Sequence, residues 1–171
     1  VRDPRDTVIS KHGSQPDDYW MHTSIGRFKE GWGLARRHAG HPRFLWLKYE
    51  DLITDPDAVQ QRIAARFPFL ASTGRFSDFH ARGEVSGPSR LALNGVRPID
   101  GSNRGKWVGH KDRLQQMLER GGMIDDELLE LGYESDRHWM ARHHIVLSDA
   151  PGSKDPELGR RYRRDHFRAA R

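Results

Sequence analysis

Arg2 stands where the sequence predicts that a strand ends and a helix begins, and this placement favours anion binding. Val1 is expected to close the strand, Asp3 to cap the helix, and Pro4 to occupy the first helical position. The free N–H groups of a helix start bind anions such as phosphate, and an arginine beside them adds a planar fork of donors. Arg2 could therefore bind a phosphate bidentately. The alternative is an ordinary helix start with Arg2 in a surface ion pair.

Ser10 lies eight positions after Arg2 and would add a hydroxyl donor to the same site. A continuous helix would separate Pro4 from Ser10 by about 9 Å of rise. The spacing alone therefore permits Arg2 and Ser10 to reach one phosphate, because arginine is long, but it does not require this.

Tyr49 follows a short apolar run, 44–47, which predicts a strand buried on both faces. Tyr49 would then lie at the same sheet edge as Arg2, where a phenol can stack on a purine or form a hydrogen bond with it. The alternative is a core tyrosine, with Glu50 and Asp51 starting a short helical turn. Paired catalytic carboxylates are not indicated, because adjacent residues in a turn point in different directions.

A third candidate group closes the long segment 72–110, which lacks hydrophobic periodicity and is rich in Gly, Ser, Arg and Pro. Arg104 and Lys106 flank Gly105, whose missing side chain would let the backbone approach a phosphate. Trp107 is expected to anchor this loop to the body of the fold. A solvated basic loop is the alternative.

These groups form three blocks in a fixed order, and together the blocks resemble the sulfotransferases that use 3′-phosphoadenosine 5′-phosphosulfate (PAPS). The resemblance is closest to bacterial members and covers roughly residues 1–133. The blocks are Arg2-Asp3-Pro4-Arg5-Asp6 with Ser10, Tyr49-Glu50-Asp51-Leu52 with Asp55-Pro56, and Ser102-Asn103-Arg104-Gly105-Lys106-Trp107.

The resemblance implies a role for each block. Arg2 and Ser10 would bind the 3′-phosphate of PAPS, and Tyr49 would contact the adenine. In many family members the third block clamps the 3′-phosphate; the candidates here are Ser102, Arg104, Gly105 and Lys106, because Asn103 stands where the bacterial pattern has arginine.

The implied reaction transfers the sulfuryl group of PAPS to a hydroxyl or amine, and 3′,5′-adenosine bisphosphate (PAP) leaves. The acceptor would be a small molecule or a carbohydrate. No metal ion is needed, because the protein's own cations can stabilise the developing charge. The ten histidines lack acidic or cysteine partners at metal-ligand spacing, so no metal site is predicted.

Two parts of the family's site cannot be placed on these residues. The glycine-rich loop that holds the 5′-phosphosulfate and the His or Glu general base both precede the Arg-Asp-Pro segment in the family. We therefore expect this chain to be the C-terminal portion of a sulfotransferase domain, inactive alone, and assign no catalytic residue.

Predicted strands and helices alternate along the chain. Helices are expected at 4–12, at 19–38, after Pro56, and at 111–120 and 125–131. This order predicts an α/β fold like that of the P-loop NTPases, in which helices flank a parallel sheet, with part of the domain present. Residues 1–133 would form this part, and 134–171 a C-terminal extension with a basic tail.

Composition limits the other functions. Residues 158–171 hold six arginines and one aspartate, which equals the whole net charge of +5, so a uniformly basic nucleic-acid surface is not indicated. No apolar run approaches the ~20 residues that cross a bilayer. The absence of cysteine fits a reducing compartment, and a cytoplasmic location is expected.

Two other functions fit parts of the sequence. A nucleotide kinase or another P-loop-type phosphotransferase would share the α/β layout and the anion-binding helix starts. A non-catalytic polyanion-binding module would depend on the arginine-rich tail at 158–171. The oligomeric state is not predicted.

Overall fold

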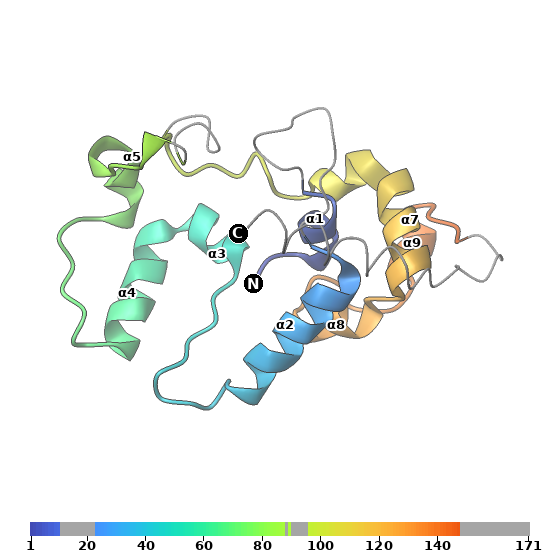
Figure 1. Cartoon of the computed structure of the whole chain (residues 1–171), viewed down its shortest axis with the longest axis horizontal. Helices are drawn as coiled ribbons and strands as arrows, with labels where there is room; N and C mark the ends of the chain where they lie inside the picture. Colours follow the sequence, from blue (N-terminus) through green and yellow to red (C-terminus); the bar gives the residue numbers. More distant parts are fainter. Residues whose placement is uncertain (11–22, 88, 90–95, 148–171) are drawn as a thin grey trace, which may run out of the picture.

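The computed structural model describes residues 1–10, 23–87, 89 and 96–147, and the regular elements of these residues are helices (Figure 1). Their bounds are α1 Pro4–Val8, α2 Ile25–Arg37, α3 Tyr49–Thr54, α4 Pro56–Arg66, η1 Phe76–Asp78, α5 Phe79–Arg82, η2 Lys106–His110, α7 Lys111–Gly121, α8 Asp125–Glu130 and α9 Trp139–Arg142, where η marks a 3₁₀ helix. No described residue belongs to a strand, so the prediction of a parallel sheet flanked by helices is wrong.

The apolar segment 44–47 shows why the strand prediction failed. Its four residues are half-buried or exposed rather than buried, and the Trp46 ring meets the Trp32 ring of α2 edge-on, with centroids 5.6 Å apart. Among the described residues, the Phe44 N–H donates to the His41 carbonyl in a turn (3.0 Å), and the Val1 amino group donates to the Leu47 carbonyl (2.5 Å). The Val1 carbonyl accepts the Tyr49 N–H (2.6 Å), two residues beyond the segment. The chain then enters α1 at Pro4, so no ladder follows.

Aspartate and proline begin two of the helices as predicted. Asp3 caps α1, and its carboxylate accepts the Arg5 N–H at 2.9 Å. Asp55 caps α4 in the same way and accepts the Ala58 N–H at 2.9 Å. Proline fits both first positions because no intrahelical bond is lost there.

Two helix boundaries differ from the predictions. α1 ends at Val8, whereas a helix to His12 was expected, and α2 begins at Ile25, whereas a start at Tyr19 was expected. Ser24 begins α2 because its hydroxyl accepts the Arg27 N–H at 3.2 Å. Residues 11–22 lie outside the described part of the chain.

The core lies between α1, α2, α7, α8 and the segment 139–145. α7 contributes Leu114, Met117 and Leu118, the stripe that its sequence predicts. The cluster's other buried members are Val8, Ile9, Ile25, Trp107, Ile124, Leu128, Trp139 and Ile145. α7 ends where the glycine pair was expected to break it. A Cβ on Gly121 would lie 2.8 Å from the Cβ of Ile25, so a larger residue would push α2 away.

A second group of helices, α3, α4, η1 and α5, lies apart from this core (Figure 1, green to cyan). Val59 of α4 is buried, and the Asp57 carboxylate accepts the Ser77 N–H at 3.0 Å, which holds η1 on α4. The segment 72–110, predicted to be aperiodic, contributes two short helices here and η2 at its end. No described helix is long and apolar enough to cross a membrane.

Candidate functional site

Arg2 is the residue at which the three sequence blocks meet. Its Nη1 lies 3.4 Å from Ser10 Oγ, and its Nη2 donates to the Asn103 carbonyl. The guanidinium carbon also lies 5.0 Å from the centre of the Tyr49 ring, within cation–π range. Residues separated by up to 101 positions in the sequence are therefore neighbours around one guanidinium group.

Ser10 lies just beyond the end of α1, and its hydroxyl has two protein partners. It donates to the Asp6 carbonyl at 2.8 Å and accepts from Arg2. The Arg2 side chain runs along α1, which brings its guanidinium group to Ser10 past one short helix. The structure thus brings together the two residues whose proximity the sequence spacing left open.

The third block forms the turn 101–106, which leads into η2. The Arg104 N–H donates to the Gly101 carbonyl at 2.9 Å, and the Ser102 N–H to the Asp100 carboxylate at 2.8 Å. Gly105 has a φ of 68°, in the left-handed region where glycine is unstrained. The side chains of Ser102, Arg104 and Lys106 are exposed on this turn.

Trp107 anchors this turn, as the sequence predicts. The ring is buried, and the Arg5 guanidinium carbon lies 4.2 Å from its centre. Trp139 meets Trp107 edge-on at 6.0 Å, and His143 does so at 4.5 Å. Burial and the positive charge of Arg5 lower the pKa of His143, so its imidazole is neutral at pH 7.

Asp6 connects the first block to the third, and it was not among the predicted site residues. Its carboxylate is fully buried and accepts the Gly105 N–H at 2.7 Å and the Trp107 N–H at 2.9 Å. The nearest Asp6 oxygen lies 3.5 Å from Arg2 Nη2. One sequence feature could have indicated a role for Asp6 outside the helix: it is a second acid in the first turn of α1, which Asp3 already caps.

Arg5 is a structural residue, although the first block places it three positions from Arg2. It is 3% exposed and pairs with Asp3 (2.8 Å) and with Glu134. Burial opposes its charge, but the bonds to Asp3 and Glu134 outweigh that effect and raise the pKa of Arg5. Arg2 keeps 24% of its side chain exposed, so it is the arginine of this block that a ligand can reach.

Glu50 positions the start of α3, and with it Tyr49. One Glu50 oxygen accepts the Asp3 N–H at 3.1 Å, and the other accepts the Tyr133 hydroxyl at 2.6 Å. Burial and this hydrogen bond raise the pKa of Tyr133, so the phenol stays protonated. Asp51 instead pairs with Arg62 at 3.0 Å. The two adjacent acids have separate structural roles, as their position in a helical turn predicts.

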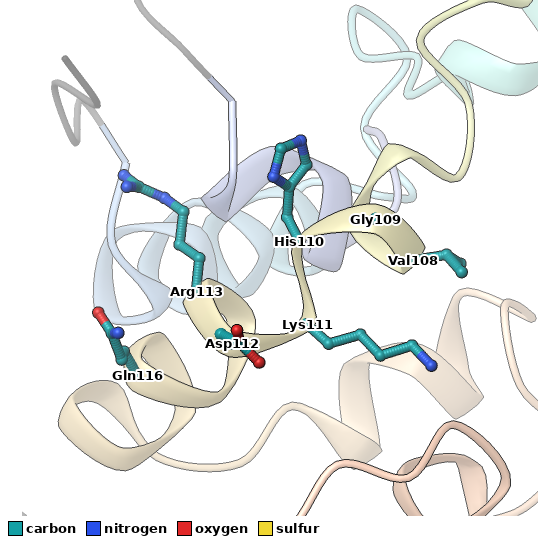
Figure 2. Close-up of a pocket in the computed structure, with 7 residues that line it drawn as sticks. All are labelled: Val108, Gly109, His110, Lys111, Asp112, Arg113 and Gln116. Carbon is teal, nitrogen blue, oxygen red and sulfur yellow. The ribbon is translucent and has the colours of Figure 1, made fainter. Parts of the chain in front are cut away.

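A surface pocket of about 600 Å³ follows the third block, at the start of α7 (Figure 2). None of the predicted site residues lines it. Lys111 points away from His110 and Arg113 in this view, so these basic groups do not converge on one point. The lining residues are Val108, Gly109, His110, Lys111, Asp112, Arg113 and Gln116.

Metal ligands do not gather in the described part of the chain: no three His, Asp or Glu side chains there could hold an ion together.

Comparisons with protein-family models, with curated proteins and with solved structures found no match. Function is therefore inferred from the three blocks and their geometry.

Proposed function

We propose that this chain provides the 3′-phosphate and adenine side of the PAPS site of a sulfotransferase. Arg2 and Ser10 would bind the 3′-phosphate, and the turn 101–106 would add the charges of Arg104 and Lys106. Tyr49 would contact the adenine. The enzyme would transfer the sulfuryl group to a hydroxyl or amine of a small-molecule or carbohydrate acceptor and release PAP.

The observation that carries this proposal is the meeting of all three blocks at Arg2. Its contacts with Ser10, Tyr49 and Asn103 join segments that a chance motif match would leave on unrelated surfaces. A nucleotide 3′-phosphate and its base lie within one nucleoside of each other, so their ligands have to converge in this way.

The hydrogen-bonding state of Arg2 fits a phosphate ligand. Its Nε is buried without a hydrogen-bond partner among the described residues. Its partners are the Ser10 hydroxyl, the Asn103 carbonyl and the Asp6 carboxylate, whose nearest oxygen lies 3.5 Å away. The free Nε donor and the exposed part of the side chain leave Arg2 able to add a phosphate ligand.

The turn supports the same assignment through its side chains. Arg104 and Lys106 form no ion pair with a described residue, and both side chains are exposed. They lie on the same turn as Asn103, whose backbone carbonyl accepts a hydrogen bond from Arg2. The Gly105 N–H is taken by Asp6, so this turn would bind phosphate through side chains rather than through its backbone.

The test is isothermal titration of the 171-residue chain with PAP and with ATP, with and without magnesium. We expect PAP to bind at least about tenfold more tightly than ATP, because one charge-assisted phosphate contact is worth ~1.5–3 kcal/mol. We expect no requirement for magnesium. Equal or tighter binding of ATP would overturn the proposal and favour a nucleotide kinase.

Two variants locate the binding site. Arg2→Ala is expected to weaken PAP binding by about ten- to hundredfold. Deletion of residues 158–171, the arginine-rich tail outside the described residues, is expected to leave PAP affinity unchanged. The opposite pattern, with affinity lost on tail deletion and kept in Arg2→Ala, would favour a polyanion-binding module.

A further inference from the structure

Asp6 links α1 to backbone groups of the third block that are distant in the sequence. Its two carboxylate oxygens accept N–H groups from residues 99 and 101 positions away, Gly105 at 2.7 Å and Trp107 at 2.9 Å. Asp6 has no exposed surface. Burying a carboxylate costs free energy unless it is hydrogen-bonded. Asp6 can therefore be buried with α1 only while these two hydrogen bonds are formed.

The helix that carries Asp6 does not use its carboxylate. Asp3 caps α1 and accepts the Arg5 N–H, so the free N–H groups of the first turn are served by another acid. The hydrogen bonds of the Asp6 side chain run to the two sides of Lys106 instead. Among the described residues its one ion-pair contact is with Arg2, at 3.5 Å.

We infer that Asp6 is a positioning residue of the nucleotide site: it fixes the turn 101–106 against Arg2 and thereby aims Arg104 and Lys106 at the 3′-phosphate. The inference rests on the proposed function. The hydrogen bonds from Gly105 and Trp107 to Asp6 fix the backbone of Lys106 between them. The carbonyl of Asn103, on the same turn, accepts a hydrogen bond from the Arg2 side chain. Asp6 would not touch the nucleotide, because it has no exposed surface and its negative charge would repel a phosphate.

Asp6→Asn removes this control with little change in volume. The amide oxygen can accept one of the two N–H groups, and the amide nitrogen then faces the other donor. We expect PAP affinity to fall by about ten- to hundredfold. We also expect trypsin to cleave after Arg104 and Lys106 at least about tenfold faster, because a loosened turn fits a protease more readily.

Asp57→Asn is the matched control. Asp57 is another helix carboxylate that accepts the backbone N–H of a residue in a separate element, Ser77 of η1, and it lies in the second group of helices. We expect this variant to keep wild-type PAP affinity and wild-type cleavage after Arg104 and Lys106. Equal losses of affinity in both variants would show general destabilisation and overturn the role of Asp6.

Amide hydrogen exchange of the wild type tests the contacts without a variant, in case Asp6→Asn does not fold. We expect the Gly105 and Trp107 amides to exchange at least about a hundredfold more slowly than the Ser102 amide, whose acceptor Asp100 is exposed. Exchange of all three at one rate would overturn the inference.

The two proposals can fail separately. If wild-type protein does not bind PAP, the proposed function and the nucleotide role of Asp6 both fail, even where exchange confirms its hold on the turn. If the wild type and Asp6→Asn bind PAP equally well, only the role of Asp6 fails.

Discussion

Arg2 Nη1 and Ser10 Oγ lie 3.4 Å apart, although eight positions and the whole of α1 separate the two residues. The helix is short enough for one arginine side chain to reach past it. The two side chains can therefore contact one ligand, which converts a weak sequence motif into a specific geometry.

Ser10→Ala tests this relationship. On binding, the Ser10 hydroxyl would turn its proton from the Asp6 carbonyl to the proposed phosphate. Removing the hydroxyl eliminates that hydrogen bond, and we expect PAP affinity to fall about two- to tenfold. Titration calorimetry measures the change, and unfolding in urea should be nearly unaffected because Ser10 is exposed. Unchanged PAP affinity would exclude Ser10 from the site.

Tyr49 is expected to act through its ring rather than through its hydroxyl. The Arg2 guanidinium carbon lies 5.0 Å from the ring centre, and a stacked purine would use the same π-system. Tyr49→Phe should therefore keep PAP affinity within about threefold, whereas Tyr49→Ala should lose about tenfold. If Tyr49→Phe loses as much as Tyr49→Ala, the hydroxyl is the contact.

Arg5 should affect stability where Arg2 affects binding. Arg5→Met leaves the buried Asp3 without its cation and removes one of the two cations of Glu134, which keeps Arg142, and we expect the free energy of unfolding to fall by ~3–5 kcal/mol. Arg62→Met, at the exposed pair with Asp51, should cost at most about 1 kcal/mol. Urea denaturation followed by tryptophan fluorescence measures both. Similar losses in the two variants would contradict the structural role of Arg5.

Acidification should destabilise the fold through His143. Burial and the nearby Arg5, Lys111 and Arg142 charges lower its pKa from the ordinary 6.5, although Glu134 opposes this. As pH falls below about 6.5, the unfolded chain binds the proton first, so stability is complete above that pH and declines below it.

His143→Phe keeps an aromatic ring beside Trp107 and removes the titration. Its free energy of unfolding should vary less than that of the wild type between pH 7 and pH 5, as measured by urea denaturation at each pH. Burial raises the pKa of Asp3, which has the opposite effect above its ordinary value, but both proteins keep Asp3, so that contribution cancels in the comparison. Parallel pH profiles for the two proteins would show that His143 is not responsible.

Several local features follow from the sequence because neighbouring residues decide them. Asp3 with Pro4 and Asp55 with Pro56 begin helices through contacts within one turn. The α7 stripe is buried because a period of 3.6 residues places Leu114, Met117 and Leu118 on one face. Trp107 could be predicted as an anchor from its size alone.

Other features depended on partners distant in the chain. The run 44–47 has the pattern of a buried strand, yet no described strand pairs with it, its residues are half-buried or exposed, and Trp46 packs edge-on against Trp32 of α2. The proposed boundary between a domain ending at residue 133 and a C-terminal extension stays a prediction. Residues just beyond it contact the main core: Glu134 forms an ion pair with Arg5, and the Trp139 indole N–H donates to Asp125. Periodicity cannot show such partners, because it reports which residues share a face and not what covers that face.

The residue types by themselves determined that Arg2, Ser10 and the segment 102–106 have groups that can bind an anion and that Tyr49 has a ring that can stack; the nucleotide is what the resemblance implies. Only the tertiary structure decided that they meet, that Arg2 rather than Arg5 stays accessible, and that Asp6 holds the turn. The physical reason is that chemical capacity belongs to a side chain, whereas accessibility and proximity depend on how burial and hydrogen bonding are satisfied across some 100 residues of intervening chain.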